Sequence, residues 1–521
     1  MDWANGYVTD IGYLNGYISE LNPVRMPLPL LQAGIMPPEV NTACELGFGQ
    51  GFSLAVHASA SKTQWWGADI NPTHAANAAS LIAAGGGAAA TSDASFADFC
   101  TRKDLPDFDF IGLHGVWSWI DAGNKAIITE FIRTKLKVGG VLYVSYNTFP
   151  GWNTMAPIRQ IMAEHQKALS PSGAGRLARV DAAMIFAEKL LATNPDYVRN
   201  APLVGERFST MQKMDRRYLA HEFFNADWAP CYFAAMAQSL GAAKLTYAGS
   251  CHSIDHVDAM NHTPEQIAFL QSIPDPILRQ SVRDVMVNQQ FRRDYWIKGP
   301  RRLDATGREA ALMDLEFVLL RPAAQAPLKA VGGRGEVTLR TELFRAVPEA
   351  MADHAPVSAR TIFERVRDKN LSWRAVQEAL FLLASNGAIT LAQRPQARRD
   401  VRGFNAHVMN LSRSRDSYSF LASPVSGGAV PVGRLQQLLL IARAAGCGSH
   451  VAMAQTVQAM LAAQGERVAF DASGTAGTAQ DERAQLIRLA AALEAELPLL
   501  QALGVVEADM EMPRSNAAAA A

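Results

Sequence analysis

The segment ACELGFGQGFSLAVHA, residues 43–58, combines an acid, three glycines at alternate positions and a following apolar run. A strand that leads into glycines and then into a helix N-terminus lets a ligand approach the backbone closely, so a nucleotide-like cofactor is expected. The glycines Gly47, Gly49 and Gly51 do not form G-x-G-x-x-G, because Phe52 stands where the third glycine of a dinucleotide site belongs. The Gly-Lys-Ser/Thr ending of a P-loop is also missing. NAD and nucleoside triphosphates are therefore disfavoured.

Glu45 narrows the choice of ligand. A carboxylate two residues before Gly47 repels a pyrophosphate and suits a ligand with cationic groups. S-adenosylmethionine carries a sulfonium, an ammonium and no phosphate, so it needs close backbone approach and acids rather than an anion site. We therefore expect S-adenosylmethionine as the cofactor, with Glu45, Gly47 and Gly49 among the residues that bind it.

Two further acids follow expected strands. Asp69 ends the second strand 22 positions after Gly47, matching the acid about 20 residues on that accepts hydrogen bonds from ribose hydroxyls. The neighbouring Ile70 is assigned to the same site. Asp93, in TSDASF, is expected at the end of the third strand, where a carboxylate can reach the adenine amino group. The alternative is that each acid is an ordinary loop or capping residue.

These residues need a parallel sheet to bring them together. The first ~150 residues alternate short β-rich runs with helical patterns, which is typical of βαβ units. Strands are expected at residues 41–47, 64–69, 108–115 and 140–147. After the second of them, Asn71 can cap a helix and Pro72 suits its first position.

The motifs ELGFGQG, GADINP, FDFIGLHG and KVGGVLYVSYN together resemble class I S-adenosylmethionine-dependent methyltransferases over residues 1–155. HGVWSW, YNTFPGW, AHEFFNADWAPCYF and FRRDYWIKG are similar to bacterial methyltransferases with a methyltransferase regulatory domain, a group that includes the rickettsial outer-membrane-protein lysine methyltransferases. This second resemblance covers most of the chain to about residue 300. Phe48 departs from the pattern, since many relatives have a small residue or cysteine there. The resemblance leaves the substrate open.

The expected fold class is α/β, with a Rossmann-like class I methyltransferase domain followed by mainly helical middle and C-terminal domains that include a winged-helix-like module. The expected domains are a cofactor-binding core with an N-terminal lid (1–155), a mainly helical middle or regulatory domain (156–320), the winged-helix-like module (336–415), a C-terminal helical domain (430–510) and a disordered tail (511–521). The Pro/Ala/Gly-rich stretch RPAAQAPLKAVGGRG is expected to be a linker.

His114, at the end of FIGLHG, is the candidate base. Methyl transfer is an in-line displacement at a carbon activated by the sulfonium, so orientation and desolvation supply most of the catalysis. A lysine amine acceptor must nevertheless lose a proton before it attacks. We expect His114 to face the cofactor and the acceptor, and the alternative is a structural histidine.

Aromatic residues are expected around the same site. Those expected to leave the carboxyl edge of the sheet are Trp117, Trp119, Tyr146 and Trp152. Such rings could desolvate a lysine and hold its cationic form, and we assign Trp117, Tyr146 and Trp152 to the catalytic site. Plain packing is the alternative. Ahead of the first strand, Tyr7, Tyr13 and Tyr17 are expected in a lid, with Tyr17 in contact with the cofactor.

The composition limits partners and location. The 49 basic and 49 acidic residues cancel, so no global field draws this chain of 521 residues to nucleic acid or to anionic lipid. We expect a protein substrate, no nucleic-acid partner and no membrane insertion. The five cysteines are scattered and lack CxxC spacing, which predicts a reducing compartment, the cytoplasm.

Two polar clusters could be taken for a metal site and a DNA-binding surface, but we expect neither function. Cys251, His252, His256 and His262 lie close together in sequence, but no second ligand cluster follows, and we expect no metal. Arginines that could form a DNA-binding wing occur at Arg394, Arg398, Arg399 and Arg402. The neutral chain favours an internal or protein-facing surface for them.

The predicted function is methyl transfer to lysine side chains of a protein. Methylation of a small molecule or a surface glycan, and a protein that binds the cofactor without turnover, stay open as alternatives.

Overall fold

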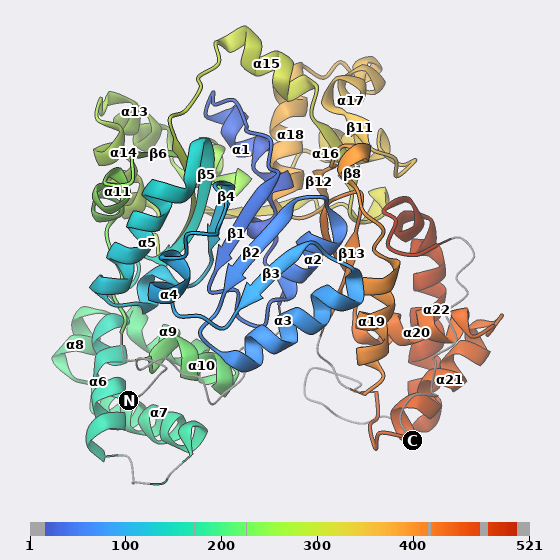
Figure 1. Ribbon diagram of the computed structural model, residues 1–521, viewed down its shortest axis with the longest axis horizontal. Coiled ribbons are helices and arrows are strands. Elements are labelled where there is room, and N and C mark those ends of the chain that lie inside the picture. The colour runs from blue at the N-terminus through green and yellow to red at the C-terminus, as the bar shows by residue number, and fades with distance from the viewer. Residues whose placement is uncertain are drawn as a thin grey trace.

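A seven-stranded sheet forms the centre of the computed structural model, which describes residues 16–169, 173, 175–225, 227–414, 418–468 and 478–507 (Figure 1). The strand order is β3-β2-β1-β4-β5-β7-β6. The strands are β1 (Thr42–Leu46), β2 (Gln64–Ala68), β3 (Ala89–Ser92), β4 (Phe108–Leu113), β5 (Leu136–Asn147), β6 (Leu245–Ser250) and β7 (Phe291–Lys298). Strand β7 runs antiparallel to both of its neighbours, and the other pairs are parallel.

Successive residues of the strands face two different cores, as the period of two requires. On β1, Ala43 belongs to one core and Cys44 to the other. The helices that contribute to the first core include α1 (Pro27–Gln32), α2 (Phe52–Ala60) and α3 (Pro72–Gly85). Those that contribute to the second include α4 (Phe96–Cys100), α5 (Ala122–Lys135) and α11 (Phe233–Gly241). Both faces of the sheet are therefore covered.

The local predictions for this region are confirmed. The four expected strands correspond to β1, β2, β4 and β5, although β5 begins earlier, at Leu136. Asn71 caps α3 by accepting a hydrogen bond from the Thr73 amide at 2.9 Å, and Pro72 occupies the first position of the helix. These features follow from neighbouring residues alone.

The sheet extends well beyond the predicted core boundary at residue 155. Residues 141–147 of β5 pair with residues 291–297 of β7, and β6 pairs with β7 on its other side. Both added strands lie in the segment expected to be a mainly helical middle domain. The pairing of β5 with β7 joins residues more than a hundred positions apart, and a local sequence pattern does not report such pairing.

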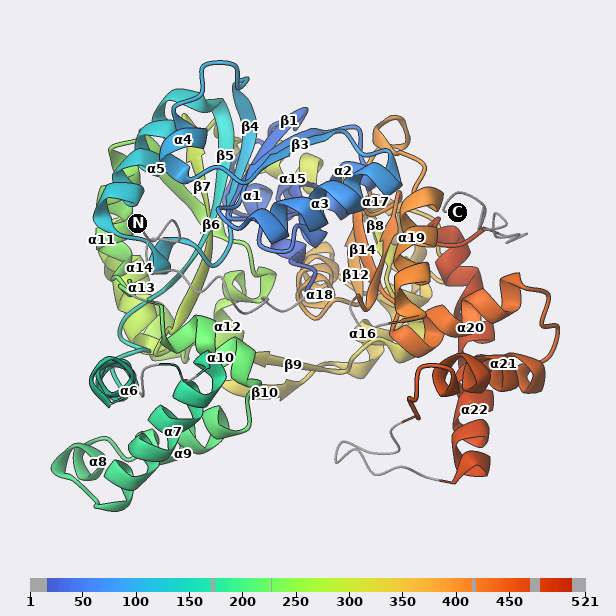
Figure 2. The same cartoon turned by 60° about the horizontal axis from the view of Figure 1, so that its bottom comes forward.

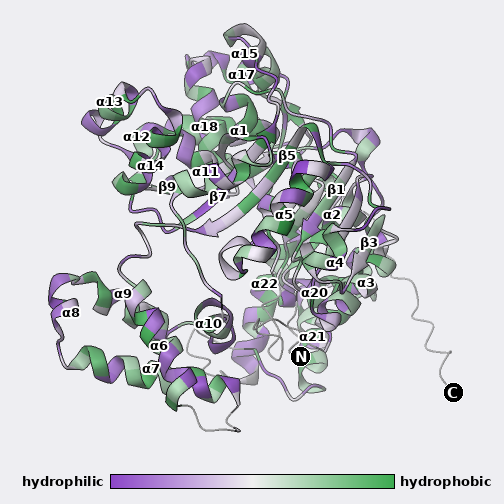
Figure 3. Cartoon of the chain, turned by 60° about the vertical axis from the view of Figure 1, so that its left-hand side comes forward, coloured by the Kyte–Doolittle hydropathy of each residue, from purple (hydrophilic) through white to green (hydrophobic). Residues whose placement is uncertain are grey.

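Five helices project from the sheet between β5 and the added strands (Figure 2). They are α6 (Ala156–Leu169), α7 (Arg176–Ala192), α8 (Asp196–Asn200), α9 (Leu203–Gln212) and α10 (Arg216–Phe223). Figure 3 shows that they carry both hydrophilic and hydrophobic stretches. Their apolar residues form a separate core that includes Trp152, Phe208 and Phe223. After α11 and β6, the helices α12 (Asp258–Asn261), α13 (Pro264–Ser272) and α14 (Pro276–Met286) lead to β7.

The segment after β7 combines short helices and strands. It contains α15 (Ala305–Met313), β8 (Glu316–Leu319), β9 (Lys329–Gly332), β10 (Gly335–Thr338), α16 (Thr341–Glu349), β11 (Val357–Ser358), α17 (Ala359–Arg365), α18 (Trp373–Ser385), β12 (Ile389–Leu391) and α19 (Arg402–Ser412). The expected linker is not wholly irregular, because β9 lies within it and pairs as a hairpin with β10, which begins at its last residue. The winged-helix interpretation stays a prediction: β12 pairs with β8, which precedes the expected module.

The last part of the described chain packs against α2 and the segment before β1. Strands β13 (Phe420–Ser423) and β14 (Gly428–Pro431) form a hairpin, and α20 (Arg434–Ala444), α21 (His450–Ala462) and α22 (Ala479–Ala502) follow. Tyr418 stacks on Phe52 of α2 with ring centroids 4.4 Å apart, and the Asn22 side chain donates to the Ser426 carbonyl at 3.1 Å. The segment expected to be a disordered tail, 511–521, lies outside the described residues.

The four arginines proposed for a wing contact protein groups. Arg394 forms an ion pair with Glu39 at 2.9 Å, and Arg402 contacts Asp400 at 2.6 Å and Glu507 at 3.0 Å. Arg398 and Arg399 donate to backbone carbonyls. The side chains of Arg394 and Arg402 are 72% and 66% exposed, so these contacts lie at the surface, and a protein-facing role for the arginines stays a prediction.

Candidate active site

A cavity of about 350 Å³ opens where β1, β2, β3 and β4 end. Its lining includes Glu45, Gly47, Gly49, Asp69, Ile70 and His114, so the fold brings together most of the residues predicted to bind the cofactor. Parallel strands place their carboxyl ends along one edge of a sheet, and for this reason loops that are distant in sequence meet here.

The glycine loop between β1 and α2 has left-handed backbone at all three glycines. A Cβ on Gly47 would lie 2.5 Å from the Val116 side chain, and one on Gly51 would lie 2.3 Å from Ala78. Gly49 has φ +57, and a Cβ there would meet no atom within 4 Å. Gly47 and Gly51 are therefore required by close packing, whereas Gly49 leaves open space beside its backbone.

Asp69 holds this loop from the end of β2. Its Oδ2 accepts a hydrogen bond from the Gly49 amide at 2.8 Å, and its Oδ1 accepts one from the Asn71 amide at 3.0 Å. His74 Nδ1 lies 3.1 Å from the same Oδ1. The carboxylate thus fixes both the loop and the start of α3.

Glu45 is a buried acid without a cation. The residue is 3% exposed, and its Oε2 has no hydrogen-bond partner among the described residues. Burial, with a smaller contribution from Asp69, raises the pKa of Glu45 to about 8. An unpaired buried carboxyl group is costly, and a cationic ligand in the cavity would relieve that cost.

The cavity as a whole is acidic. The carboxyl groups that line it belong to Glu45, Asp69, Asp121, Glu222 and Asp227. No lysine or arginine stands among the described residues of the lining. Such a lining repels phosphates and attracts cations.

His114 faces the cavity from the end of β4. Its Nδ1 lies 2.7 Å from the Tyr143 hydroxyl, and the two rings stack at a centroid distance of 6.0 Å. Burial lowers the pKa of His114 to about 4, with Glu20 opposing and Arg293 adding to the shift. The imidazole is therefore neutral at physiological pH, the form that can accept a hydrogen bond or a proton.

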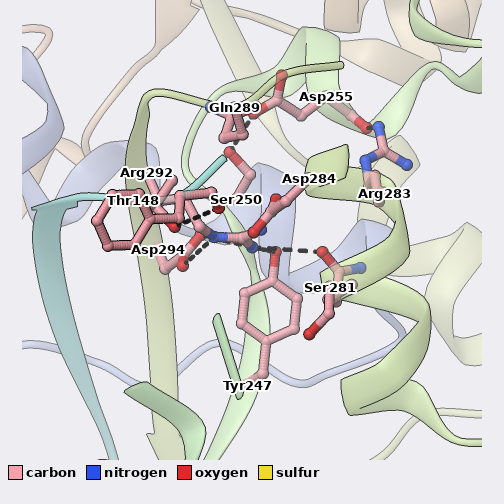
Figure 4. Close-up of polar contacts among 12 residues, drawn as sticks. Thr148, Tyr247, Ser250, Asp255, Ser281, Arg283, Asp284, Gln289, Arg292 and Asp294 are labelled. Atoms are coloured by element: carbon pink, nitrogen blue, oxygen red, sulfur yellow. Dashed lines mark hydrogen bonds and ion pairs between the residues drawn. The ribbon is translucent and has the colours of Figure 1, made fainter. Parts of the chain in front are cut away.

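The three aromatic residues assigned to the catalytic site do not line the cavity, and packing explains each. Trp117 lies in the core on the α5 side of the sheet. Tyr146 is buried, and its hydroxyl donates to Asp294 at 2.8 Å. The Arg292 side chain also binds Asp294 (Figure 4). Trp152 packs against Phe223 and Trp228 in the core of the helices α6–α10. Trp119, from the same loop as Trp117, does line the cavity.

Tyr17 is predicted to contact the cofactor, but in the structure its side chain contacts other residues of the protein. Its hydroxyl lies 3.1 Å from His57 Nε2, and its ring lies against Phe420 of the C-terminal hairpin. The neighbouring Ile18 and Leu21 line the cavity instead, so the segment before β1 does cover it. Tyr7 and Tyr13, the other expected lid residues, lie outside the described residues.

Asp93 follows β3 as expected, but its side chain is exposed and absent from the lining. Ala94, Ser95 and Phe96 line the cavity in its place. A shift of one or two residues along a loop decides which side chain faces a cavity, and strand positions alone do not define it.

Sequence reasoning missed the side of the cavity formed by α10. Tyr218, His221, Glu222 and Asn225 of this region line it, followed by Asp227. Their spacing of three and four residues, in YLAHEFFN, marks one face of a helix and was the available signal.

The histidine-rich stretch after β6 has structural contacts. His256 Nε2 lies 2.7 Å from the Ser250 carbonyl, and His252 Nε2 lies 2.6 Å from the Arg293 guanidinium. Across the described ranges, no group of three or more His, Cys, Asp or Glu side chains could hold a metal ion. Within the same ranges, no helix is long and apolar enough to span a bilayer.

Comparisons with known proteins place the chain in a family. Residues 215–298 match the model of a predicted methyltransferase regulatory domain. The uncharacterized protein sll1526 of Synechocystis is 34% identical over 515 residues, which cover 97% of this chain and 100% of that protein. The uncharacterized protein RP789 of Rickettsia prowazekii is 26% identical over 278 residues, covering 52% of this chain and 49% of that one.

A solved structure shares the fold over nearly the whole length. PKMT2 from Rickettsia typhi, in complex with AdoHcy, gives a TM-score of 0.67 at 16% identity and covers 94% of this chain and 99% of that chain. The expected Rossmann-like class I methyltransferase fold is thereby confirmed. The chain belongs to the family of methyltransferases that carry the methyltransferase regulatory domain.

Proposed function

We propose that this protein transfers a methyl group from S-adenosylmethionine to lysine side chains of a protein. The observation that carries the proposal is the cavity itself, which is lined by acids, contains no lysine or arginine among its described lining residues, and holds the unpaired Glu45 carboxyl group.

The cavity suits S-adenosylmethionine better than the common phosphate-bearing cofactors. Glu45 can pair with an ammonium, Gly49 leaves space for close approach, and Asp69 stands where ribose hydroxyls are usually bound. NAD and ATP would place phosphates in an acidic site without a cation. The complex of PKMT2 from Rickettsia typhi with AdoHcy, the demethylated form of this cofactor, supports the same choice.

The chain's own residues have distinct roles in this proposal. Glu45, Gly47, Gly49, Asp69 and Ile70 hold and orient the cofactor. Bound S-adenosylmethionine supplies a methyl group activated by its sulfonium.

His114 stays neutral and faces the cavity, where it can accept a hydrogen bond from the acceptor amine, while its lowered pKa makes it a weak base for the amine's proton. The segment that contains Ile18 and Leu21 covers the cavity and excludes water.

The acceptor is proposed to be a lysine because a cationic side chain fits an acidic lining. An amine enters as an ammonium, which carboxylates attract, and it becomes reactive after desolvation and loss of a proton. A cytoplasmic location belongs to the same proposal and is supported by five cysteines that are all free thiols.

Incubation of the purified protein with methyl-labelled S-adenosylmethionine and cell lysate tests the proposal. Label on protein lysines, identified by gel and mass spectrometry and lost with Asp69→Ala, is the expected result. Label found only on small molecules or glycans would mean that the acceptor is a small molecule or a surface glycan rather than a protein lysine. Tight cofactor binding with no transfer to any fraction would mean that the protein does not turn over.

A further inference from the structure

Helix α10 is amphipathic, yet both of its faces lie inside the protein. Its apolar residues Leu219, Ala220 and Phe223 are buried in the core of the helices α6–α10. Its opposite face turns Tyr218, His221 and Glu222 into the cavity, and Asn225 continues this stripe just beyond the helix. A charged side chain that meets a cavity rather than bulk solvent is stabilised by a ligand of opposite charge.

Glu222 is the charged member of this polar stripe. Within the described parts of the chain its carboxylate makes no hydrogen bond and no ion pair. The positive charge of Arg159 on α6 acts to lower its pKa. The Arg159 guanidinium donates to the Asn225 carbonyl at 3.0 Å and lies over the Trp228 ring at 4.6 Å, and it forms no ion pair with Glu222 among the described residues. Glu222 is therefore not the partner of a fixed cation.

Electrostatics shows that Glu222 is desolvated and close to Tyr218. Burial raises the pKa of Glu222 to about 7, partly opposed by Arg159. Burial, followed by the charge of Glu222, raises the pKa of Tyr218 to about 12. The two residues are four positions apart on one helix, so their side chains are neighbours.

The order of the strands places the polar stripe of α10 away from the residues that are proposed to bind the cofactor. Glu45 lies near the end of β1, and Asp69 and Ala94 follow β2 and β3, whereas the chain reaches α10 only after it leaves β5. In the strand order, β5 lies on the opposite side of β4 from β1, β2 and β3. His114, at the end of β4, stands between the two groups. Glu45, buried and unpartnered in the same cavity, independently indicates that the cavity takes cations.

We infer that the polar stripe of α10 is the binding site for the acceptor's primary ammonium group, with Glu222 as the residue that selects it. This inference rests on the proposed function. A carboxylate with a phenol beside it favours an alkylammonium over a neutral hydroxyl or a carboxylate. Glu222 would therefore position an amine acceptor and disfavour sugars and acids.

Two nitrogen analogues of S-adenosylmethionine test this inference without a known acceptor. In both, a tertiary amine replaces the sulfonium; one carries a butyl arm and the other a 4-aminobutyl arm that extends toward the acceptor site. Calorimetry should show that the wild-type protein binds the aminobutyl analogue about tenfold or more tightly than the butyl analogue. Glu222→Gln should abolish this preference and leave the affinity for S-adenosylhomocysteine unchanged.

Control variants distinguish a failure of this inference from a failure of the proposed function. Glu206→Gln removes an exposed acid of the neighbouring helix α9 and should keep the full preference. Glu222→Asp keeps the charge on a shorter side chain and should keep part of it, which provides a second reading if Glu222→Gln folds poorly. Equal binding of both analogues to the wild-type protein, or a preference that survives in Glu222→Gln, would overturn the inference. Failure of the wild-type protein to bind S-adenosylhomocysteine would instead overturn the proposed function.

Discussion

The Gly49 amide donates a hydrogen bond to Asp69 Oδ2 at 2.8 Å, so the glycine loop after β1 is fastened to the end of β2. The two residues follow adjacent parallel strands, β1 and β2, and both line the cavity. The same carboxylate retains acceptor capacity for a ligand, since each oxygen can accept more than one hydrogen bond. In the proposed complex, the glycine loop and the ligand share this one carboxylate.

Asp69→Ala should weaken S-adenosylhomocysteine binding by about tenfold or more, because charge-assisted hydrogen bonds to the ligand are lost. Calorimetry measures the affinity, and circular dichroism checks that the variant is folded. Asp93→Ala is the matched control, since that acid follows the next strand but is exposed and outside the lining. Wild-type affinity in folded Asp69→Ala would contradict the placement of the cofactor.

Gly49→Ala tests whether a ligand approaches the loop backbone. The new methyl group would enter open space, so the cost to the free protein is limited to left-handed strain of about 1 kcal/mol. Gly86, with φ +58 and equally open surroundings at the end of α3, gives a matched control. Both variants should lose similar stability in chemical denaturation, and only Gly49→Ala should lose affinity for S-adenosylhomocysteine. Equal affinity in the two variants would place the ligand away from Gly49.

Glu45 should make cofactor binding depend on pH. In the free protein its pKa is about 8, so the carboxyl group is mostly protonated at pH 7. Pairing with a ligand ammonium favours the carboxylate, and binding should therefore release a proton and strengthen as pH rises from 6 toward 8. Calorimetry at pH 7 in buffers of different ionisation enthalpy counts the released protons. Glu45→Gln should bind more weakly and release fewer; unchanged proton release would assign the effect to another group.

The same raised pKa also acts on the stability of the ligand-free protein. A carboxyl group whose pKa is higher in the folded than in the unfolded state stabilises the fold below the unfolded value, near 4.3, and loses this contribution as pH rises through about 8. Glu45→Gln should therefore be more stable than the wild-type protein at pH 8 and not at pH 4. Thermal unfolding at the two pH values measures the difference.

Trp152→Ala should act on folding rather than on chemistry. The side chain is 5% exposed and packs among aromatic residues, so its removal should cost about 3–5 kcal/mol of stability. Chemical denaturation measures this loss, and activity should follow the folded fraction. Trp152→Phe keeps most of the packing and should stay active. A stable Trp152→Ala variant with reduced turnover and unchanged cofactor affinity would restore the ring to the acceptor site.

Local features of the site could be predicted because their causes are local. A strand, a glycine turn and a helix start follow from adjacent residues, and so do the Asn71 cap and the position of Asp69 at a strand end. The cationic character of the ligand followed from one acid, Glu45, beside the glycines. The aromatic residues failed for the opposite reason. Trp117, Tyr146 and Trp152 lie on or shortly after β4 and β5, as the prediction required. The direction of each side chain, however, depends on what packs against it.

The sequence by itself thus determined a parallel α/β core and the residues after its first strands that line one side of the cavity, because these depend on short-range geometry and on the order of strands. Only the tertiary structure decided that β6 and β7 complete the sheet, that the hairpin of β13 and β14 takes Tyr17 away from the cavity, and that α10 forms its acidic side. Each of these pairings brings together residues tens to hundreds of positions apart. They are selected by the burial of apolar surface over the whole chain, which no local pattern encodes.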